Sequence, residues 1–340
     1  MYRRFFPLLI AFLLVLAALP LAGDAAAASI FDPHSPSGTA IARLFWLVLG
    51  ISAIVFIVVE VALIAFAVRY RQRGEAGEPR QIFGNRRMEL LWTGIPAVTL
   101  AIVFVIMVAT MRGVSAGPAN DPNALTIEVI GHQWWWEYRY PGQQFVTANE
   151  LHLPAGQTVH LRLGSADVIH DFWVPQLGRK MDLIPGQTND LWVQVDAPGV
   201  YAGSCAEYCG AQHAGMRLRV VADTPTDFAA WVAGQQRGEP SASGDTAAIA
   251  RGRELFFQGA GNCASCHAIA GTTAKGNVGP DLSHVGGRAT LAAGVITNTP
   301  DTMQRWLLNP QAIKPGNRMP NLRLSEGDAH DLAAYLESLK

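Results

Sequence analysis

The sequence has 340 residues, a formal net charge of -1 at neutral pH and a pI near 6.8. The balanced charge gives no indication of nucleic-acid binding, and the length allows two soluble domains in addition to membrane spans. The positive mean hydropathy, +0.17, is unusual for a soluble protein and comes from long apolar runs in the first third of the chain.

Residues 1–28 have the pattern of a secretory signal peptide. Arg3 and Arg4 come first, an apolar stretch follows over 5–19, and small residues fill 25–28. The alternative is a retained membrane anchor, although the apolar core is short for a span.

Two longer apolar runs, 41–68 and 90–111, predict a transmembrane helical hairpin within residues 29–119, because each can cross about 30 Å of hydrocarbon as a helix. Basic residues outnumber acidic ones between the runs, which predicts a cytoplasmic loop and places everything after Met111 on the periplasmic side of a bacterial inner membrane. Glu60 lies inside the first run, where an ionisable group is costly, so its helix face is expected to contact another subunit. The basic residues are Arg69, Arg71, Arg73, Arg80, Arg86 and Arg87, against Glu75 and Glu78.

Residues 120–223 have the pattern of an all-β domain. Short alternating runs at 125–130, 158–163 and 191–195 are separated by Pro, Gly and Asn, which predicts a β-sandwich or barrel. Residues 224–246 follow as a short helix, at 227–236, and a linker rich in Gly, Pro and Ser.

The segment 205–216 gathers metal-binding side chains: Cys205, Cys209, His213 and Met216 lie within twelve residues, and His170 lies upstream. Thiolate, thioether and imidazole ligands together favour copper, whereas zinc sites rarely use Met. A single blue-copper ion needs one Cys, so the pair suggests two copper ions bridged by both sulfurs. A Cys205–Cys209 disulfide is the alternative in an oxidising compartment.

Residues 247–340 predict a small helical domain. Helical patterns cover 247–258, 302–308 and 326–339, whereas 262–300 is rich in Gly, Asn and Pro. So much loop in so short a domain requires something large at its centre to complete a core.

The motif Cys263-Ala-Ser-Cys266-His267 predicts that this central group is a covalently attached haem c, with His267 as one axial ligand. Met319, in a Met-Pro sequence downstream, is the expected second ligand, since a His and Met pair is typical of electron-transfer cytochromes. Met303 and His284 are alternative candidates for this second ligand. Met303, however, lies in a predicted helix and is better explained as a core residue. His284 can equally be an ordinary loop residue.

The hairpin and the segments 131–138, 168–175 and 205–216 resemble subunit II of haem-copper cytochrome c oxidases over residues 30–225, and residues from 247 onward resemble class I cytochromes c. The resemblance implies a multidomain membrane protein in which a transmembrane α-hairpin is followed by a cupredoxin-like β-sandwich and an all-α cytochrome c domain. It also implies a binuclear copper A centre. Its ligands would be His170, Cys205, Cys209, His213, Met216 and the Glu207 carbonyl.

Three further roles follow from the resemblance alone. The Glu207 carboxylate would face a magnesium or manganese site shared with subunit I. Trp134 would be the residue through which electrons reach the copper domain from a cytochrome c, and Trp135 and Trp136 are equally well explained as core residues. Glu89, at the cytoplasmic end of the second span, would mark a proton-uptake entrance into subunit I.

The function implied is that of subunit II of a respiratory cytochrome c oxidase. Electrons from cytochrome c or a cytochrome bc complex would pass through the haem and the copper pair to subunit I, where dioxygen is reduced to water with proton pumping; subunits I and III are the expected partners. The small subunit of a copper-containing nitric oxide reductase is the alternative, which Glu89 and the match around Trp134 disfavour. A free-standing redox module is disfavoured by the two spans and Glu60, and a quinol oxidase subunit by the Cys pair.

Overall fold

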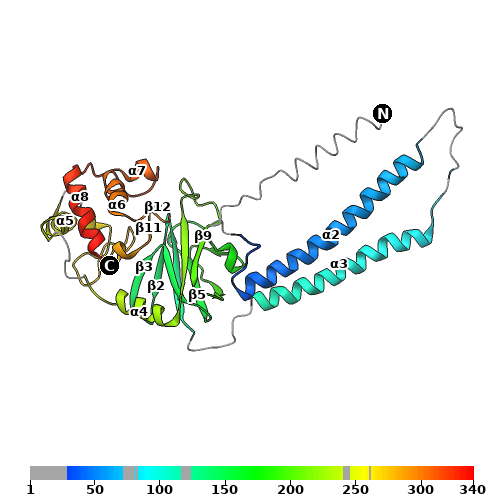
Figure 1. The fold of residues 1–340 in the computed structure, drawn as a ribbon, viewed down its shortest axis with the longest axis horizontal. Helices are drawn as coiled ribbons and strands as arrows, with labels where there is room; N and C mark the ends of the chain where they lie inside the picture. Colours follow the sequence, from blue (N-terminus) through cyan, green and yellow to red (C-terminus); the bar gives the residue numbers. More distant parts are fainter. Residues whose placement is uncertain (1–28, 72–80, 82, 116–123, 240–245, 260–261) are drawn as a thin grey trace.

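The structure, a computed structural model, describes residues 29–71, 81, 83–115, 124–239, 246–259 and 262–340. The predicted signal peptide, most of the loop between the two spans and the Ser-rich part of the linker lie outside these residues. Three parts follow one another along the long axis: a helical hairpin, a β-domain and a helical domain that contains the carboxyl end (Figure 1).

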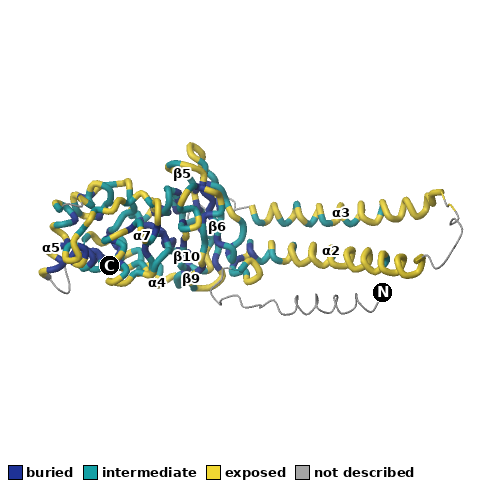
Figure 2. Tube along the Cα trace, turned by 90° about the horizontal axis from the view of Figure 1, so that it is seen from above, coloured by how far each residue is buried: buried dark blue, intermediate teal, exposed yellow. Residues whose placement is uncertain are grey.

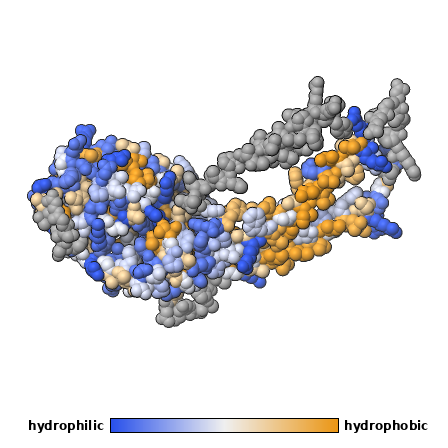
Figure 3. Space-filling model, in the orientation of Figure 1, coloured by the Kyte–Doolittle hydropathy of each residue, from blue (hydrophilic) through white to orange (hydrophobic). Residues whose placement is uncertain are grey.

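The hairpin consists of α2 (Pro36–Arg69) and α3 (Arg86–Ser115), and both are long and apolar enough to cross a membrane. Most residues of both helices are exposed, which Figure 2 shows in yellow, and the surface of the hairpin is largely apolar, which Figure 3 shows in orange. Water would make such a surface unfavourable, so it is suited to lipid or to other membrane helices.

Both helices begin earlier than the apolar runs because polar caps precede them. Ser35 Oγ accepts from the Gly38 amide at 2.8 Å, and Asn85 Oδ1 accepts from the Arg87 amide at 3.1 Å. Ser35 Oγ also donates to the Leu177 carbonyl of the β-domain at 2.8 Å. The first turn of α2 is therefore fixed to the β-domain.

The β-domain is a sandwich of two five-stranded sheets in the described chain, with strand orders β3-β2-β1-β5-β8 and β4-β10-β9-β6-β7. Side chains alternate between core and surface along each strand: Ile127 and Val129 of β1 and Leu161 of β5 are fully buried. The strands are β1 (Thr126–His132), β2 (Trp135–Tyr140), β3 (Phe145–Ala148), β4 (Glu150–Pro154), β5 (Thr158–Ser165), β6 (His170–Trp173), β7 (Met181–Leu183), β8 (Asn189–Gln194), β9 (Gly199–Cys205) and β10 (Arg217–Asp223).

Helix α4 (Pro225–Gln235) connects the two soluble domains and lies against the sandwich. Trp231 stacks on His152 with ring centroids 4.1 Å apart, and it also contacts Tyr140. The chain thus stays attached to the β-domain until shortly before the linker.

The helical domain is built from α5 (Thr246–Gln258), α6 (Pro300–Leu308), α7 (Pro310–Ile313) and α8 (Glu326–Ser338), with a two-stranded ribbon of β11 (Thr290–Leu291) and β12 (Ile296–Thr297). Helices α5 and α8 cross through Phe256 and Tyr335, whose rings are 5.8 Å apart. Helix α6 starts two residues before the predicted 302, because Thr299 and Thr302 form a reciprocal capping box. The fold class expected from the sequence is confirmed.

Candidate functional site

The candidate copper ligands converge at one end of the sandwich. His170 opens β6, Cys205 ends β9, and the others lie on the loop between β9 and β10. The two cysteine sulfurs are 3.8 Å apart, with His170 Nδ1 3.9 Å from Cys205 Sγ and His213 Nδ1 3.7 Å from Cys209 Sγ. Met216 Sδ lies 3.9 Å from Cys209 Sγ. Each sulfur therefore has its own imidazole neighbour.

This donor set fits a copper pair. Both thiols are free, and their separation is far beyond the roughly 2.05 Å of a disulfide bond. The Glu207 carbonyl oxygen lies 3.2 Å from Cys205 Sγ, which adds a main-chain donor to the cluster. Cys205, Cys209, His170 and Met216 are all buried, so a metal held between them would be shielded from water.

The electrostatics of the cluster favour a metal-binding thiolate. The Cys209 thiol beside it, followed by the hydrogen bond with His170, lowers the pKa of Cys205 to about 3, against the opposing effect of burial. The pKa of Cys209 rises because it shares the site with Cys205 and because it is buried. A thiolate is the form in which cysteine binds a metal.

Two residues that the sequence did not single out hold His170 in place. Asp167 Oδ1 is 2.9 Å from His170 Nε2, which leaves Nδ1 facing Cys205. Burial raises the pKa of Asp167, but hydrogen bonds from His170 and two backbone amides outweigh it and lower the pKa to about 2. Gly131 is required as well, since a Cβ there would lie 2.7 Å from His170 Cδ2. A carboxylate three residues before a candidate histidine ligand is the signal that sequence reasoning missed.

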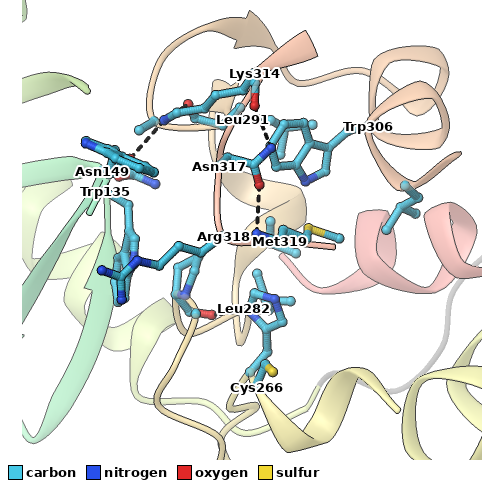
Figure 4. A pocket seen from close by; sticks show the side chains of 18 of the residues that line it. Trp135, Asn149, Cys266, Leu282, Leu291, Trp306, Lys314, Asn317, Arg318 and Met319 are labelled. Atoms are coloured by element: carbon cyan, nitrogen blue, oxygen red, sulfur yellow. Dashed lines mark hydrogen bonds between the residues drawn. The ribbon is translucent and has the colours of Figure 1, made fainter. Parts of the chain in front are cut away.

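The candidate haem site is a pocket between the helical domain and the β-domain (Figure 4). Its lining is mainly apolar and includes Val278, Leu282 and Trp306, together with Cys266 and His267 of the CxxCH motif. Bonds from the Cys266 and His267 amides to the Cys263 carbonyl, 3.1 and 2.9 Å long, fold the motif into one turn. A large, mainly apolar group is what this lining would accommodate.

His267 has the geometry and protonation expected of an iron ligand. Its Nδ1 lies 2.8 Å from the Pro280 carbonyl oxygen, so Nε2 is left for a metal. Burial lowers the pKa of His267, which favours the neutral imidazole. Gly279 makes room for the ring, because a Cβ there would be 2.5 Å from His267 Cε1.

Two methionines line this pocket. Met319 sits on a loop fixed by its own amide, which donates to Asn317 Oδ1 at 2.8 Å, and by its carbonyl, which accepts from Gln311 at 2.8 Å. Met303 is 2% exposed on α6 and belongs to the core of the domain. His284 lies outside this pocket's lining, with Nε2 3.1 Å from the Gln235 carbonyl oxygen.

Arg288 provides a further test of whether a haem fits. It lines the same pocket, and its Nε is buried without a hydrogen-bond partner among the described residues. A haem carries two carboxylates, and a buried guanidinium donor is their natural partner. The cavity thus offers both the apolar volume and a cationic group for such a cofactor.

Trp134 lies between the two candidate cofactor sites. It lines the haem pocket, and its indole Nε1 donates to the Cys209 carbonyl at 2.9 Å, beside a 2.8 Å bond from Gln133 to the same oxygen. Trp135 also lines the pocket and stacks on His132 at 4.1 Å, whereas Trp136 is fully buried in the sandwich core.

Lys314 is a further residue that the sequence did not single out, because the segment 314–320 was interpreted through its methionine. It is 4% exposed, and its Nζ donates to the carbonyls of Trp134, Gly215 and Ala292 at 2.8, 2.8 and 2.9 Å. Burial lowers the pKa of Lys314 to about 7, yet three carbonyl acceptors match the three N–H groups of the ammonium form.

The remaining predicted residues lie apart from these sites or at their edge. Glu89 is exposed in the first turn of α3, at the end of the hairpin remote from the β-domain (Figure 1). Glu60 is exposed in the second half of α2. The Glu207 side chain is exposed on the loop between β9 and β10, called the copper loop from here on, and has no partner within the described chain.

Comparison with known proteins identifies the parts of the chain separately. Family descriptions match as "Cytochrome C oxidase subunit II, transmembrane domain" over residues 25–111, "Cytochrome C oxidase subunit II, periplasmic domain" over 143–223 and "Cytochrome c" over 249–340.

Full-length relatives agree with these matches. The chain is 36% identical over 317 residues to cytochrome c oxidase subunit 2 of Alkalihalophilus pseudofirmus, covering 91% of this chain and 90% of the relative. It is 31% identical over 350 residues to the protein of the same description from Bacillus subtilis, with 96% and 97% coverage. The crystal structure of the periplasmic domain of subunit II of cytochrome oxidase of Bradyrhizobium japonicum aligns with 32% identity and a TM-score of 0.33, covering 35% of this chain and 96% of that one.

Proposed function

Because the chain belongs to the cytochrome c oxidase subunit II family and carries a cytochrome c domain at its carboxyl end, we propose that it relays electrons through that domain and then its copper domain. When bound, haem c and a binuclear copper A centre would each hold one electron in transit from cytochrome c or a cytochrome bc complex to subunit I, where dioxygen is reduced to water with proton pumping. This chain is the relay component of the oxidase complex.

The residues of the chain bind and shield these groups. Cys263 and Cys266 would attach the haem, and His267 and Met319 would bind its iron. His170, His213, the two cysteines Cys205 and Cys209, Met216 and the Glu207 carbonyl would hold the copper pair. Four of the copper ligands, His170, Cys205, Cys209 and Met216, are buried, which limits water at that site and keeps the reorganisation of the surroundings small when charge moves.

The position of Trp134 is the observation that carries the proposal. One indole borders the haem pocket and hydrogen-bonds to the carbonyl of a candidate copper ligand, Cys209. Trp134 therefore forms a direct packed connection between the two sites. An electron donor that docks on the haem domain needs no access to the copper domain.

Assembly within the oxidase follows from the family and from exposed features. The apolar hairpin would contact subunits I and III in the bacterial inner membrane, with both soluble domains, residues 120–223 and 247–340, on the periplasmic side. The exposed Glu207 carboxylate would complete a magnesium or manganese site with subunit I. Glu89, exposed at the cytoplasmic end of α3, would mark a proton-uptake entrance.

Purification of the whole complex tests the proposal. With an artificial reductant of the haem and no added cytochrome c, the complex should consume dioxygen, and the chain should stain for haem after denaturation. The stain should be lost when Cys263 and Cys266 are replaced by Ser. Consumption of nitric oxide in place of dioxygen would identify the complex as a nitric oxide reductase and refute the assignment.

A further inference from the structure

Lys314 lies in the helical domain, which is the haem domain of the proposal, and its side chain reaches into the β-domain, which is the copper domain. Two of its three hydrogen bonds cross the boundary between the domains. One goes to the carbonyl of Trp134, the residue whose indole bonds to Cys209, and the other goes to the carbonyl of Gly215, the residue before Met216. The third acceptor, Ala292 O, belongs to the haem domain itself. A single buried ammonium thus ties together the bridging tryptophan, the copper loop and a haem-domain loop.

Glu150 forms a second connection, in the opposite direction. It lies on β4 of the copper domain, is 5% exposed and accepts hydrogen bonds from the Ala289 amide at 3.1 Å and from the Thr290 amide and hydroxyl at 2.9 Å each. A carboxylate on one domain and an ammonium on the other therefore each end among polar groups of the neighbouring domain.

Further bonds strengthen the contact along the segment that leads to Met319. Arg318 donates to Gln133, whose own amide donates to the Cys209 carbonyl, and Gln212 of the copper loop donates to the Pro315 carbonyl. Arg318 directly precedes Met319 and Gln212 directly precedes His213, so both of these contacts lie beside a candidate ligand. The contact is therefore specific in orientation and is not a chance collision of tethered domains.

We propose that Lys314 is a positioning residue which, together with Glu150, holds the haem domain in one docked orientation against Trp134. The inference rests on the proposed relay and adds to it the claim that transfer starts from a docked state. A linker alone gives the haem domain an effective concentration of about millimolar order at the copper domain. Without the Lys314 and Glu150 contacts, the haem domain would therefore spend time away from the copper domain. Buried ionic groups make separation costly, because each would have to leave its partners unpaired or regain water.

The test measures electron transfer in the full chain, loaded with haem and copper and kept in detergent. The haem is reduced by a flash, and the appearance of reduced copper is followed at increasing glycerol viscosity. Transfer from a docked state should not depend on viscosity. Lys314→Met should slow transfer by about tenfold or more, which is the size expected for loss of a buried hydrogen bond to a charged group, and should make the rate fall with viscosity. Lys275→Met, which removes an exposed lysine of the same domain, should leave both unchanged.

Glu150→Ala provides an independent arm, since Glu150 is outside the copper loop. It should also make transfer viscosity-dependent, with the copper spin spectrum and haem spectrum unaltered. If Lys314→Met alters the copper spectrum, Glu150→Ala alone decides. Rates equal to wild type and independent of viscosity in the variants with intact spectra would overturn the docking proposal. Failure of the wild-type haem to reduce the copper at all would refute the relay itself, which is a separate outcome.

Discussion

Met319 and Met303 show how much the surroundings of a residue decide its role. Both line the haem pocket, so proximity does not separate them. Met303 belongs to a packed helix and its side chain completes a core, whereas Met319 is presented by a loop whose backbone is fixed on both sides by hydrogen bonds. A loop fixed in this way can present a thioether to the haem iron, whereas using Met303 as the ligand would remove its side chain from the packed core.

Met319→Ala should therefore leave the haem covalently attached but remove the sulfur-to-iron absorption band at the red end of the spectrum. Met303→Ala should keep the band and lower stability by about 2–5 kcal/mol, as expected for truncation of a buried methionine. Absorption spectra of the oxidised chain distinguish the two. Loss of the band in Met303→Ala alone would reverse the assignment.

Asp167 would be a positioning residue for the proposed copper cluster, because it is hydrogen-bonded to the ring nitrogen of His170 that faces away from Cys205. Asp167→Asn should weaken copper binding by about 10- to 100-fold while leaving the fold intact. A copper titration followed by the spin spectrum measures this, with Asp196→Asn, an exposed aspartate of the same domain, as control. Equal affinities would mean that His170 is held by packing alone.

At the scale of elements, the periodicity of apolar residues was sufficient to locate most of the strands and helices. The two-residue alternation in 125–130 and 158–163 and the helical pattern in 326–339 correspond to β1, β5 and α8. Pairing was not predictable, because parallel neighbours such as β1 and β5 are distant in sequence and no local signal links them. The role of Lys314 was not predictable for the same reason, since the residues that bury it are distant in sequence. By sequence alone it is a lysine in a polar loop, where a solvated side chain is expected.

The loop between β9 and β10 carries most of the candidate copper ligands, and its arrangement predicts how much copper the chain binds. Because both cysteine sulfurs face the cluster, the full chain should bind two copper ions, be purple and show a spin spectrum shared between two nuclei. Replacing Met216 with Leu should retain the copper and shift its potential, since an axial thioether tunes more than it holds. Copper analysis gives the stoichiometry, and one ion per chain with a mononuclear pattern would contradict the bridged pair.

At the scale of the whole molecule, the haem domain lies at the end remote from the hairpin, with the copper domain between them (Figure 1). A donor arriving from the periplasm would meet the haem domain first, and the hairpin would hold the copper domain near the membrane. The haem domain covers the Trp134 face of the copper domain, so in the proposed relay the fusion would replace a docking encounter between two proteins with a contact within one chain.

The central claim is that electrons pass from the haem to the copper within one chain. The most direct measurement is flash reduction of the haem in the loaded full chain, without cytochrome c, at protein concentrations that differ by about a hundredfold. Because effective concentration within a chain does not depend on dilution, copper reduction should be first-order with the same rate constant throughout. A rate that rises in proportion to protein concentration would show that electrons move between chains and would contradict the account.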